Sequence, residues 1–347
     1  MMPSTENFTR LFRDQEVSDC FTIGTDSELL SLYKSNLFDP MQEFLSRPKK
    51  GFRAELVHMG QALAIASTNK GEYQITEAQT QQASLFTNVI EFLHAGSLIV
   101  DDIEDQSQWR RGKQTMHELY GIPIALNAGN WLYFWPLMLI QNADLKVQIK
   151  HQALFECHQT LLLAHTGQAL DVGTPMSQLP RERTIALVMK SIELKSGVLT
   201  ALAMKLGALT VLNSSEAETL ALIDRTGRHI GQLLQFYDDI GNLTSSQNPQ
   251  KQYEDLRLQR PSFIWSALAE TSSPVEYQAF ISDLKVTHTS KDFGLLVEKW
   301  QLAQRARAQA TIRRDLWMEE LRAQTTNFNT QLVRSINDLI ERLSNAY

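Results

Sequence analysis

The stretch Ser97-Leu-Ile-Val-Asp101-Asp102-Ile-Glu-Asp105 joins an apolar helical segment directly to a cluster of carboxylates. Asp101 and Asp105 are four residues apart, so a helix places them on one face, with Asp102 beside them. Like charges at this spacing destabilise an isolated helix, but they tolerate each other when a divalent cation lies between them. Carboxylate oxygens suit Mg²⁺, which is commonly shared with substrate phosphates. The stretch therefore predicts a buried helix that ends in a magnesium-binding cluster; a solvated acidic helix end is the simpler alternative.

The rest of the chain is dominated by the helical period, in which apolar residues recur every three or four positions. Strand-like runs are nearly absent, and 347 residues include only 16 glycines and 10 prolines. No linker and no repeat of fixed period divides the chain. We therefore expect one all-α domain over residues 1–347, with roughly ten or more helices. The expected helices cover residues 54–64, 77–100, 124–140, 148–170, 183–210, 214–240, 262–269, 275–284, 293–321 and 330–343.

Composition excludes several classes of protein. The 33 lysines and arginines against 39 aspartates and glutamates give a net charge of −6, which offers no general attraction to nucleic acid. Cys20 and Cys157 form no disulfide framework, and the polar N-terminus lacks a signal-peptide core. The longest apolar run, residues 131–140, is about half of the roughly 20 residues that a membrane span needs. We expect a soluble, cytoplasmic protein that does not span a membrane.

A second aspartate pair ends another apolar helix, in the stretch Leu233-Leu-Gln235-Phe-Tyr-Asp238-Asp239-Ile-Gly-Asn242. Two such helices facing each other would direct two carboxylate clusters across one cavity. That arrangement can hold more than one Mg²⁺ around a diphosphate. The cations would neutralise the leaving group and make its departure feasible.

Basic residues that could bind a diphosphate lie on both sides of the first aspartate cluster in the sequence. Arg110-Arg111-Gly112-Lys113 comes a few residues after Asp105, and the planar guanidinium of arginine fits phosphate oxygens. Lys50 and Arg53 lie at the start of a predicted helix, where exposed amides favour anions. A charged surface loop is the alternative for the arginine pair. His94 is two helical turns before Asp101 and so faces the same side, although a hydrogen-bonded core histidine is the alternative.

These residues resemble the trans-isoprenyl diphosphate synthases, or polyprenyl synthetases. The resemblance extends over about two thirds of the chain. Its pieces, in order, are Lys50-x-x-Arg53, His94-x-x-Ser97-Leu-Ile-x-Asp101-Asp102-x-x-Asp105, Arg110-Arg111-Gly112, Gly167-Gln168-x-x-Asp171, Lys195-Ser196 and Gln235-x-x-Asp238-Asp239.

The resemblance implies a role for each matching residue. Catalysis falls to Asp101, Asp102, Asp105, Lys195 and Asp238. The four aspartates hold the metal on an allylic diphosphate, with support from Asp239 and with Asp171 and Gln168 nearby. Contacts to that diphosphate fall to Arg110, Lys195, Ser196, Gln235 and Arg260. Binding of isopentenyl diphosphate falls to Lys50, Arg53, His94 and Arg111.

The resemblance also implies the fold, the reaction and the cofactor. The fold is the all-α isoprenoid synthase bundle around a central cavity, usually as a homodimer. Two or three Mg²⁺ ions assist loss of diphosphate, and isopentenyl diphosphate attacks the resulting allylic cation. The departed diphosphate takes the proton, and buried helices keep the cation from water. The expected enzyme is a geranylgeranyl-type polyprenyl diphosphate synthase.

Asn242 replaces the usual last aspartate of the second cluster; it keeps an oxygen ligand but removes a charge, so weaker metal binding is expected there. The resemblance also implies that the residues one turn before the first aspartate limit the growing chain. Here they are Gly96 and Ser97, both small, so a product of about twenty carbons or somewhat more is expected. Leu93 lies one turn further back. Trp131, Phe134 and Trp135 could form the floor of the cavity; core or dimer packing is the alternative.

Two other functions stay open at this point. A terpene cyclase or irregular coupling enzyme has the same fold, but its usual second motif fails here at Asn242 and Ser246. A non-catalytic subunit that modulates a partner synthase should have lost aspartates from its first cluster, and this chain retains them. Isopentenyl diphosphate and an allylic diphosphate are therefore the expected substrates.

Overall fold

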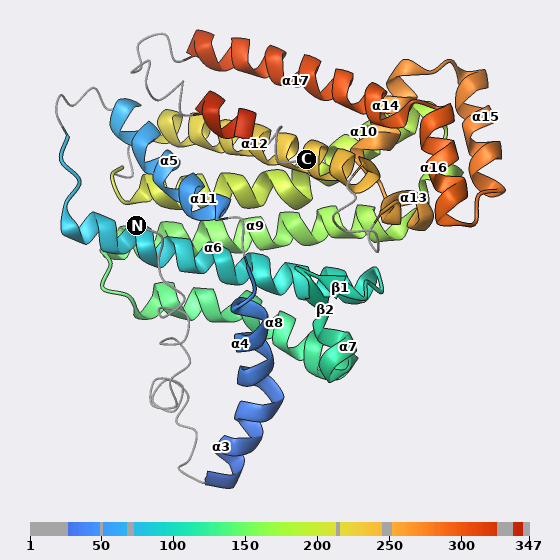
Figure 1. Cartoon of the computed structure of the whole chain (residues 1–347). Coiled ribbons are helices and arrows are strands. Elements are labelled where there is room, and N and C mark those ends of the chain that lie inside the picture. Colours follow the sequence, from blue (N-terminus) through green and yellow to red (C-terminus); the bar gives the residue numbers. More distant parts are fainter. Residues whose placement is uncertain are drawn as a thin grey trace. The chain divides into compact units, whose positions relative to one another are not determined.

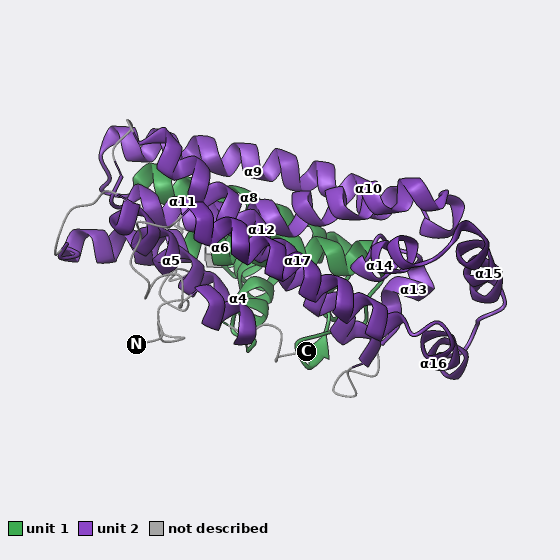
Figure 2. Cartoon of the chain, turned by 90° about the horizontal axis from the view of Figure 1, so that it is seen from above, with its two compact units in different colours: residues 1–51, 88–142 green, residues 52–87, 143–347 purple. Residues whose placement is uncertain are grey.

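The structure, a computed structural model, describes residues 27–48, 51–67, 73–212, 216–244, 252–324 and 336–342, and nearly all of these are helical (Figure 1). The chain divides into two compact units (Figure 2). Unit 1 comprises Met1–Gly51 and Asn88–Asn142, and unit 2 comprises Phe52–Thr87 and Ala143–Tyr347.

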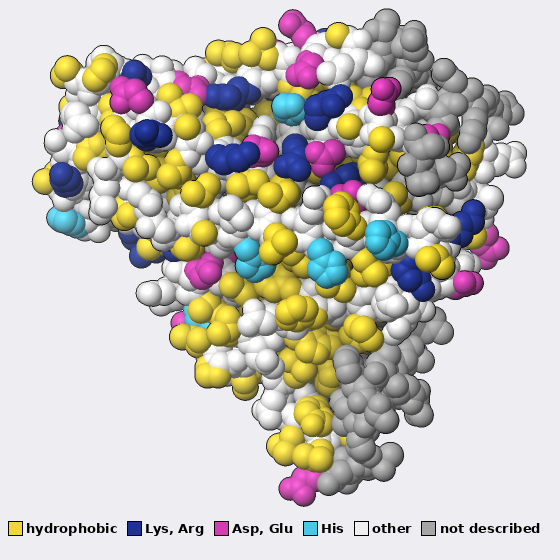
Figure 3. Space-filling model, turned by 180° about the vertical axis from the view of Figure 1, so that it is seen from behind, with side chains coloured by type: hydrophobic (Ala, Val, Ile, Leu, Met, Phe, Trp, Pro, Cys, Tyr) yellow, Lys and Arg dark blue, Asp and Glu magenta, His cyan; other side chains and the backbone are white. Residues whose placement is uncertain are grey.

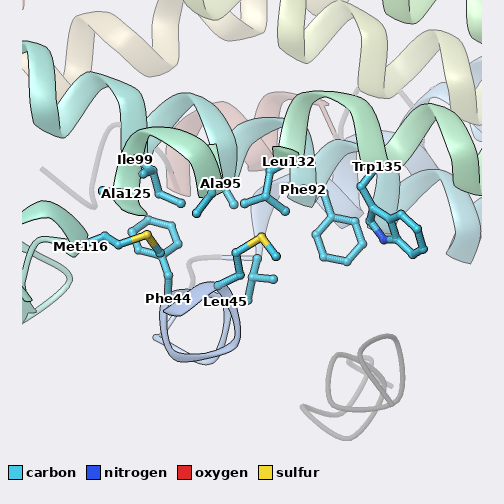
Figure 4. Packing of buried hydrophobic residues seen from close by; sticks show 11 residues of the cluster. Phe44, Leu45, Phe92, Ala95, Ile99, Met116, Ala125, Leu132 and Trp135 are labelled. Atoms are coloured by element: carbon cyan, nitrogen blue, oxygen red, sulfur yellow. The ribbon is translucent and has the colours of Figure 1, made fainter. Parts of the chain in front are cut away.

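Unit 1 is built on the C-terminal part of the long helix α6 (Glu77–Glu104). Its other elements are α3 (Ser27–Tyr33), the π-helix η1 (Lys34–Phe38), α4 (Asp39–Leu45), β1 (Trp109–Arg110), β2 (Lys113–Gln114), α7 (Met116–Tyr120) and α8 (Ile122–Asn142). A buried cluster holds them together: Phe44 and Leu45 of α4 meet Phe92 and Ala95 of α6 (Figure 4). Each fully buried Phe or Leu contributes about 1.5–3 kcal/mol.

A two-residue hairpin turn connects β1 to β2. The strands pair antiparallel, with Trp109 opposite Gln114 and Arg110 opposite Lys113. The turn residues Arg111 and Gly112 have φ angles of 55° and 78°. Positive φ at both central positions is the combination that matches the twist of a hairpin, and glycine adopts it without strain. The arginine pair therefore sits on a hairpin of defined geometry.

Unit 2 surrounds the helix α11 (Val198–Leu209), which is buried on all sides and packs against α5 (Phe52–Ser67), α9 (Val147–Gly173) and α12 (Ala217–Thr244). Gly60 of α5 and Gly207 of α11 allow a close crossing, because a Cβ at Gly60 would lie 1.9 Å from the Met204 carbonyl oxygen. The other elements of unit 2 are α5 (Phe52–Ser67), α9 (Val147–Gly173), η2 (Met176–Gln178), α10 (Arg181–Ile192), the π-helix η3 (Glu193–Gly197), α12 (Ala217–Thr244), α13 (Glu254–Leu258), α14 (Phe263–Thr271), α15 (Pro274–Lys285), α16 (Ser290–Lys299) and α17 (Leu302–Gln324).

The all-α prediction is confirmed, and the described residues form more than ten helices. Two predicted helices are interrupted: residues 183–210 contain η3, and residues 293–321 break at Gln301, whose φ is 50°. Residues 336–342 of the predicted last helix are helical, and the rest of it lies outside the described residues. The single-domain prediction stays a prediction.

Helix α6 is the one helix in the described part of the chain that is long and apolar enough to cross a membrane. However, 61% of its most apolar window is buried inside the protein, which is the behaviour of a core helix.

Candidate functional site

The first aspartate cluster lies at the end of α6 in unit 1. Arg110 contacts two carboxylates of this cluster. Arg110 Nε donates to Asp102 Oδ1 at 2.8 Å, and Arg110 Nη2 lies 3.4 Å from Asp101 Oδ2. Asp102 is buried, with 1% of its surface exposed, whereas Asp101, Asp105 and Arg110 are half-buried. A buried carboxylate needs such a charge-assisted partner. The structure thus brings the predicted residues Asp101, Asp102 and Arg110 into one group.

Three residues in or just after α4 hold the hairpin that carries Arg110. The sequence alone does not predict this role for them. Arg47 Nη1 donates to the Arg110 carbonyl oxygen at 3.2 Å, and Lys113 Nζ donates to Glu43 Oε1 at 3.0 Å. The Arg111 guanidinium lies 5.7 Å from the centre of the Phe44 ring. The spacing of Glu43 and Arg47 indicates a helical ion pair, but no signal in the sequence connects that pair to the hairpin.

The residues assigned to chain length lie on α6 before Asp101. Ser97 is half-buried, and its Oγ donates to the His94 carbonyl oxygen at 2.9 Å. Leu93 is buried and His94 is half-buried. Gly96 lies at a close crossing with α8, since a Cβ there would be 2.8 Å from the Gly129 carbonyl oxygen. A bulky residue at Gly96 would disturb this crossing, so Ser97 is the better position at which to test product length.

The aromatic residues proposed as a floor for the cavity have different surroundings. Trp131 and Trp135 stack with ring centres 4.9 Å apart, and Trp135 belongs to the buried core of unit 1. Phe134 is 68% exposed. Trp135 thus lies in the core, Trp131 is partly buried against it, and Phe134 lies on the surface; the cavity floor stays a prediction.

A group of basic residues and Asp171 lies in unit 2. Lys195 Nζ donates to Asp171 Oδ2 at 2.7 Å, and Arg260 Nη1 lies 3.4 Å from the Asp171 backbone oxygen. Lys195 belongs to the π-helix η3, a wide turn of a kind that is frequent at functional sites. Two predicted phosphate ligands, Lys195 and Arg260, are thus brought to Asp171, which comes from a different helix.

A chain of hydrogen bonds connects the predicted residues Ser196, Gln235 and Asp239. Ser196 Oγ donates to Gln235 Oε1 at 2.6 Å, and Gln235 Nε2 donates to Asp239 Oδ1 at 2.7 Å. The Phe263 amide, at the start of α14, donates to Asp239 Oδ2 at 2.6 Å. Both Asp239 oxygens therefore have partners within the protein, which favours a supporting role for this carboxylate.

The environment of Asp239 also changes its acidity. Burial raises the pKa of Asp239 well above its ordinary value, and the charges of Asp255 and Asp238 add to this effect. The hydrogen bonds from Phe263 and Gln235 oppose it. Asp238 itself is exposed and is the carboxylate of this pair that faces solvent.

The end of the second cluster has an oxygen suited to a cation. Asn242 Nδ2 donates to Asp255 Oδ2 at 3.1 Å, while Asn242 Oδ1 is buried and has no hydrogen-bond partner among the described residues. A buried amide oxygen in this state fits a hard cation or a water. Within the described ranges, no three His, Cys, Asp or Glu side chains lie close enough to hold a metal alone. The donor set fits Mg²⁺ that takes part of its ligands from phosphate oxygens.

The N-terminal basic pair is only partly described. Lys50 lies outside the described residues. Arg53 is half-buried on the first turn of α5, in unit 2. Its predicted role in binding a diphosphate stays a prediction.

Comparison with known proteins gives the same family that the residues suggest. Geranylgeranyl pyrophosphate synthase of Eremothecium gossypii is 30% identical over 214 residues, which cover 60% of this chain and 61% of that protein. Ophiobolin F synthase of Aspergillus clavatus is 26% identical over 70% of this chain and 30% of that protein. The chain thus matches less than two thirds of the length of either relative.

A solved structure with a similar fold is geranylgeranyl pyrophosphate synthase from Corynebacterium glutamicum, complexed with isoprenyl diphosphate and magnesium. It superposes with a TM-score of 0.74 at 18% identity, over 98% of each chain. The fold is therefore that of the isoprenoid synthase helical bundles. Residues 34–293 match the family model for polyprenyl synthetase. The chain belongs to the polyprenyl synthetase family.

Proposed function

We propose that this protein is a magnesium-dependent prenyltransferase. It condenses isopentenyl diphosphate with an allylic diphosphate, head to tail, to a polyprenyl diphosphate of about twenty carbons or somewhat more. The observation that carries the proposal is the contact of Arg110 with Asp101 and Asp102 at the end of α6. This group combines cation ligands with a phosphate ligand at one place. The geranylgeranyl pyrophosphate synthases among the relatives support the same reaction.

The roles of the residues follow from their chemistry. Mg²⁺ bound at the aspartates would neutralise the diphosphate as it leaves. Arg110 and Lys195 carry permanent charge to phosphate oxygens, and each is already held by a carboxylate that fixes its position. The hydrogen-bonded chain through Gln235 holds Asp239 of the second aspartate pair. The buried apolar residues of α6 keep water from a cationic intermediate.

The product assay tests this function. The protein is incubated with Mg²⁺, isopentenyl diphosphate and, separately, five-, ten- and fifteen-carbon allylic diphosphates, and the products are sized. We expect linear polyprenyl diphosphates and no turnover in EDTA. A cyclic hydrocarbon from an allylic diphosphate alone would support the second candidate, a terpene cyclase, which the match to ophiobolin F synthase favours. Binding of diphosphate without turnover would indicate a non-catalytic subunit.

We also propose that the protein is a homodimer that associates through the exposed face of α9. Val147, Phe155 and Leu162 are 77%, 49% and 72% exposed on this helix. Phe155 and Leu162 are seven residues apart, as are the exposed His151, His158 and His165, so they form one stripe along it. A row of histidines among hydrophobic side chains is visible in Figure 3. The regular spacing of these apolar side chains would let the stripe on α9 pack against the same stripe on a second copy of the chain.

A further inference from the structure

A buried arginine that the proposed reaction does not use lies beneath the hairpin of residues 109–114. The Arg47 side chain has 0% of its surface exposed, which is rare for arginine. It lies directly after α4, in unit 1. Because no part of its guanidinium reaches solvent, Arg47 cannot itself be a ligand for diphosphate without a rearrangement.

Arg47 has partners on both sides. Its Nε and Nη2 donate to Glu43 at 3.1 and 2.7 Å, and its Nη1 donates to the Arg110 carbonyl oxygen at 3.2 Å. The guanidinium also lies 5.1 Å from the centre of the Phe44 ring. The planar guanidinium of an arginine can make these contacts at the same time, whereas the compact ammonium group of a lysine cannot.

The same α4 residues also hold the other basic side chains of the hairpin. Glu43 accepts from Lys113, and the Phe44 ring lies under the Arg111 guanidinium. Burial alone would raise the pKa of Glu43, but the hydrogen bonds from Arg47 and Lys113 outweigh it and hold this pKa below its ordinary value. Phe44 is in turn fixed in the core of unit 1 (Figure 4). The hairpin is therefore anchored by its backbone and by two of its side chains.

We infer that Arg47 is a positioning residue: it holds the 109–114 hairpin so that Arg110 and Arg111 present their guanidinium groups to a diphosphate. This inference rests on the proposed function for the identity of the ligand. The geometry of the anchor is independent of it. A displacement of about 1 Å of a group that positions substrate can lower the rate roughly a hundredfold. A residue that never touches the diphosphate can therefore control how Arg110 and Arg111 engage it.

The test compares Arg47→Gln with Arg181→Gln as a matched control. Like Arg47, Arg181 donates to backbone oxygens, those of Ala269 and Ser272; it is half-buried and belongs to unit 2. Two readouts are measured: hydrogen exchange of the amides of residues 107–115, and the affinity for inorganic pyrophosphate with Mg²⁺. The Thr115 amide, which donates to the Gln108 carbonyl oxygen at 2.9 Å, reports directly on the base of the hairpin.

We expect Arg47→Gln to speed exchange in residues 107–115 about tenfold, the factor for one lost charge-assisted hydrogen bond, and to weaken pyrophosphate binding at least as much. Arg181→Gln should change neither. If Arg47→Gln does not fold, Arg47→Lys should give the same changes in smaller degree. Unchanged exchange in the folded variant, or an equal loss in Arg181→Gln, would overturn the inference. If wild type binds no pyrophosphate, the proposed function fails, while the exchange comparison still decides the role of Arg47.

Discussion

At the scale of single residues, Asn242 is the clearest departure from the family pattern, and its contacts give it a measurable consequence. Its amide nitrogen donates to Asp255, a bond that an aspartate at this position could not make. We predict that Asn242→Asp lowers stability by about 1–2 kcal/mol without metal, because a hydrogen bond to a carboxylate is replaced by charge repulsion.

Mg²⁺ should reverse this loss, since a second carboxylate is a better cation ligand than an amide. The measurement is the Tm of wild type and variant with and without Mg²⁺ and pyrophosphate. We expect the ligands to raise the Tm of Asn242→Asp by more than that of wild type. An equal shift in both proteins would show that Asn242 lies away from the metal.

The size of the side chain at Ser97 is expected to affect product length. Ser97 is half-buried one turn before Asp101, and its hydroxyl donates to the His94 carbonyl oxygen of its own helix. Ser97→Phe should shorten the main product to about fifteen carbons, because the ring occupies the space beside the growing chain. Product chromatography measures this. Products of unchanged length from an active variant would remove Ser97 from the wall of the cavity.

At the scale of elements, the crossing of α5 and α11 depends on two glycines. A Cβ at Gly60 or Gly207 would lie 1.9 or 1.8 Å from a carbonyl oxygen of the facing helix. We predict that Gly60→Ala lowers the free energy of unfolding by about 3 kcal/mol, because the backbones must separate. Gly173→Ala is the control, since nothing lies within 4 Å of its Cβ position.

Denaturant titration measures both variants. Gly173→Ala should be neutral or slightly stabilising, because alanine favours helix. Equal stabilities for Gly60→Ala and wild type would mean that the two helices do not cross as closely as the structure has them.

The helices were predictable from sequence because their apolar period is a local property. Helix α6, for example, begins at the predicted residue Glu77 and extends only a few residues past its predicted end. The turn at Gln301 and the π-helix η3 were not predicted, because the apolar period continues through both. The hairpin around Gly112 was also missed, since its strands are only two residues each.

The site was predictable in its residues but not in its contacts. Asp101 and Asp102 are marked by their spacing, so the carboxylates could be named in advance. The anchoring of Arg110 by Arg47 could not, because it joins residues that are far apart in the sequence and depends on how α4 packs. The bond between Lys195 and Asp171 is of the same kind.

At the scale of the whole molecule, the exposed stripe on α9 makes a prediction about assembly. Leu162→Glu should convert a homodimer into a monomer, because it places a charge in an apolar contact. Leu316→Glu is the matched control: Leu316 is 61% exposed on α17, comparable to the 72% of Leu162. Light scattering after size exclusion measures the mass. A wild-type monomer, or dissociation by both variants, would contradict this interface. The cytoplasmic location stays a prediction.

We propose that this chain elongates allylic diphosphates with its aspartate clusters. The most direct measurement is the rate of isopentenyl diphosphate incorporation with Mg²⁺ by wild type, Asp102→Asn, Asp238→Asn and the exposed control Asp144→Asn. We expect linear products from wild type and from the control, and losses of about a hundredfold or more in kcat for the two cluster variants. Cluster variants that are folded and as active as wild type would contradict it.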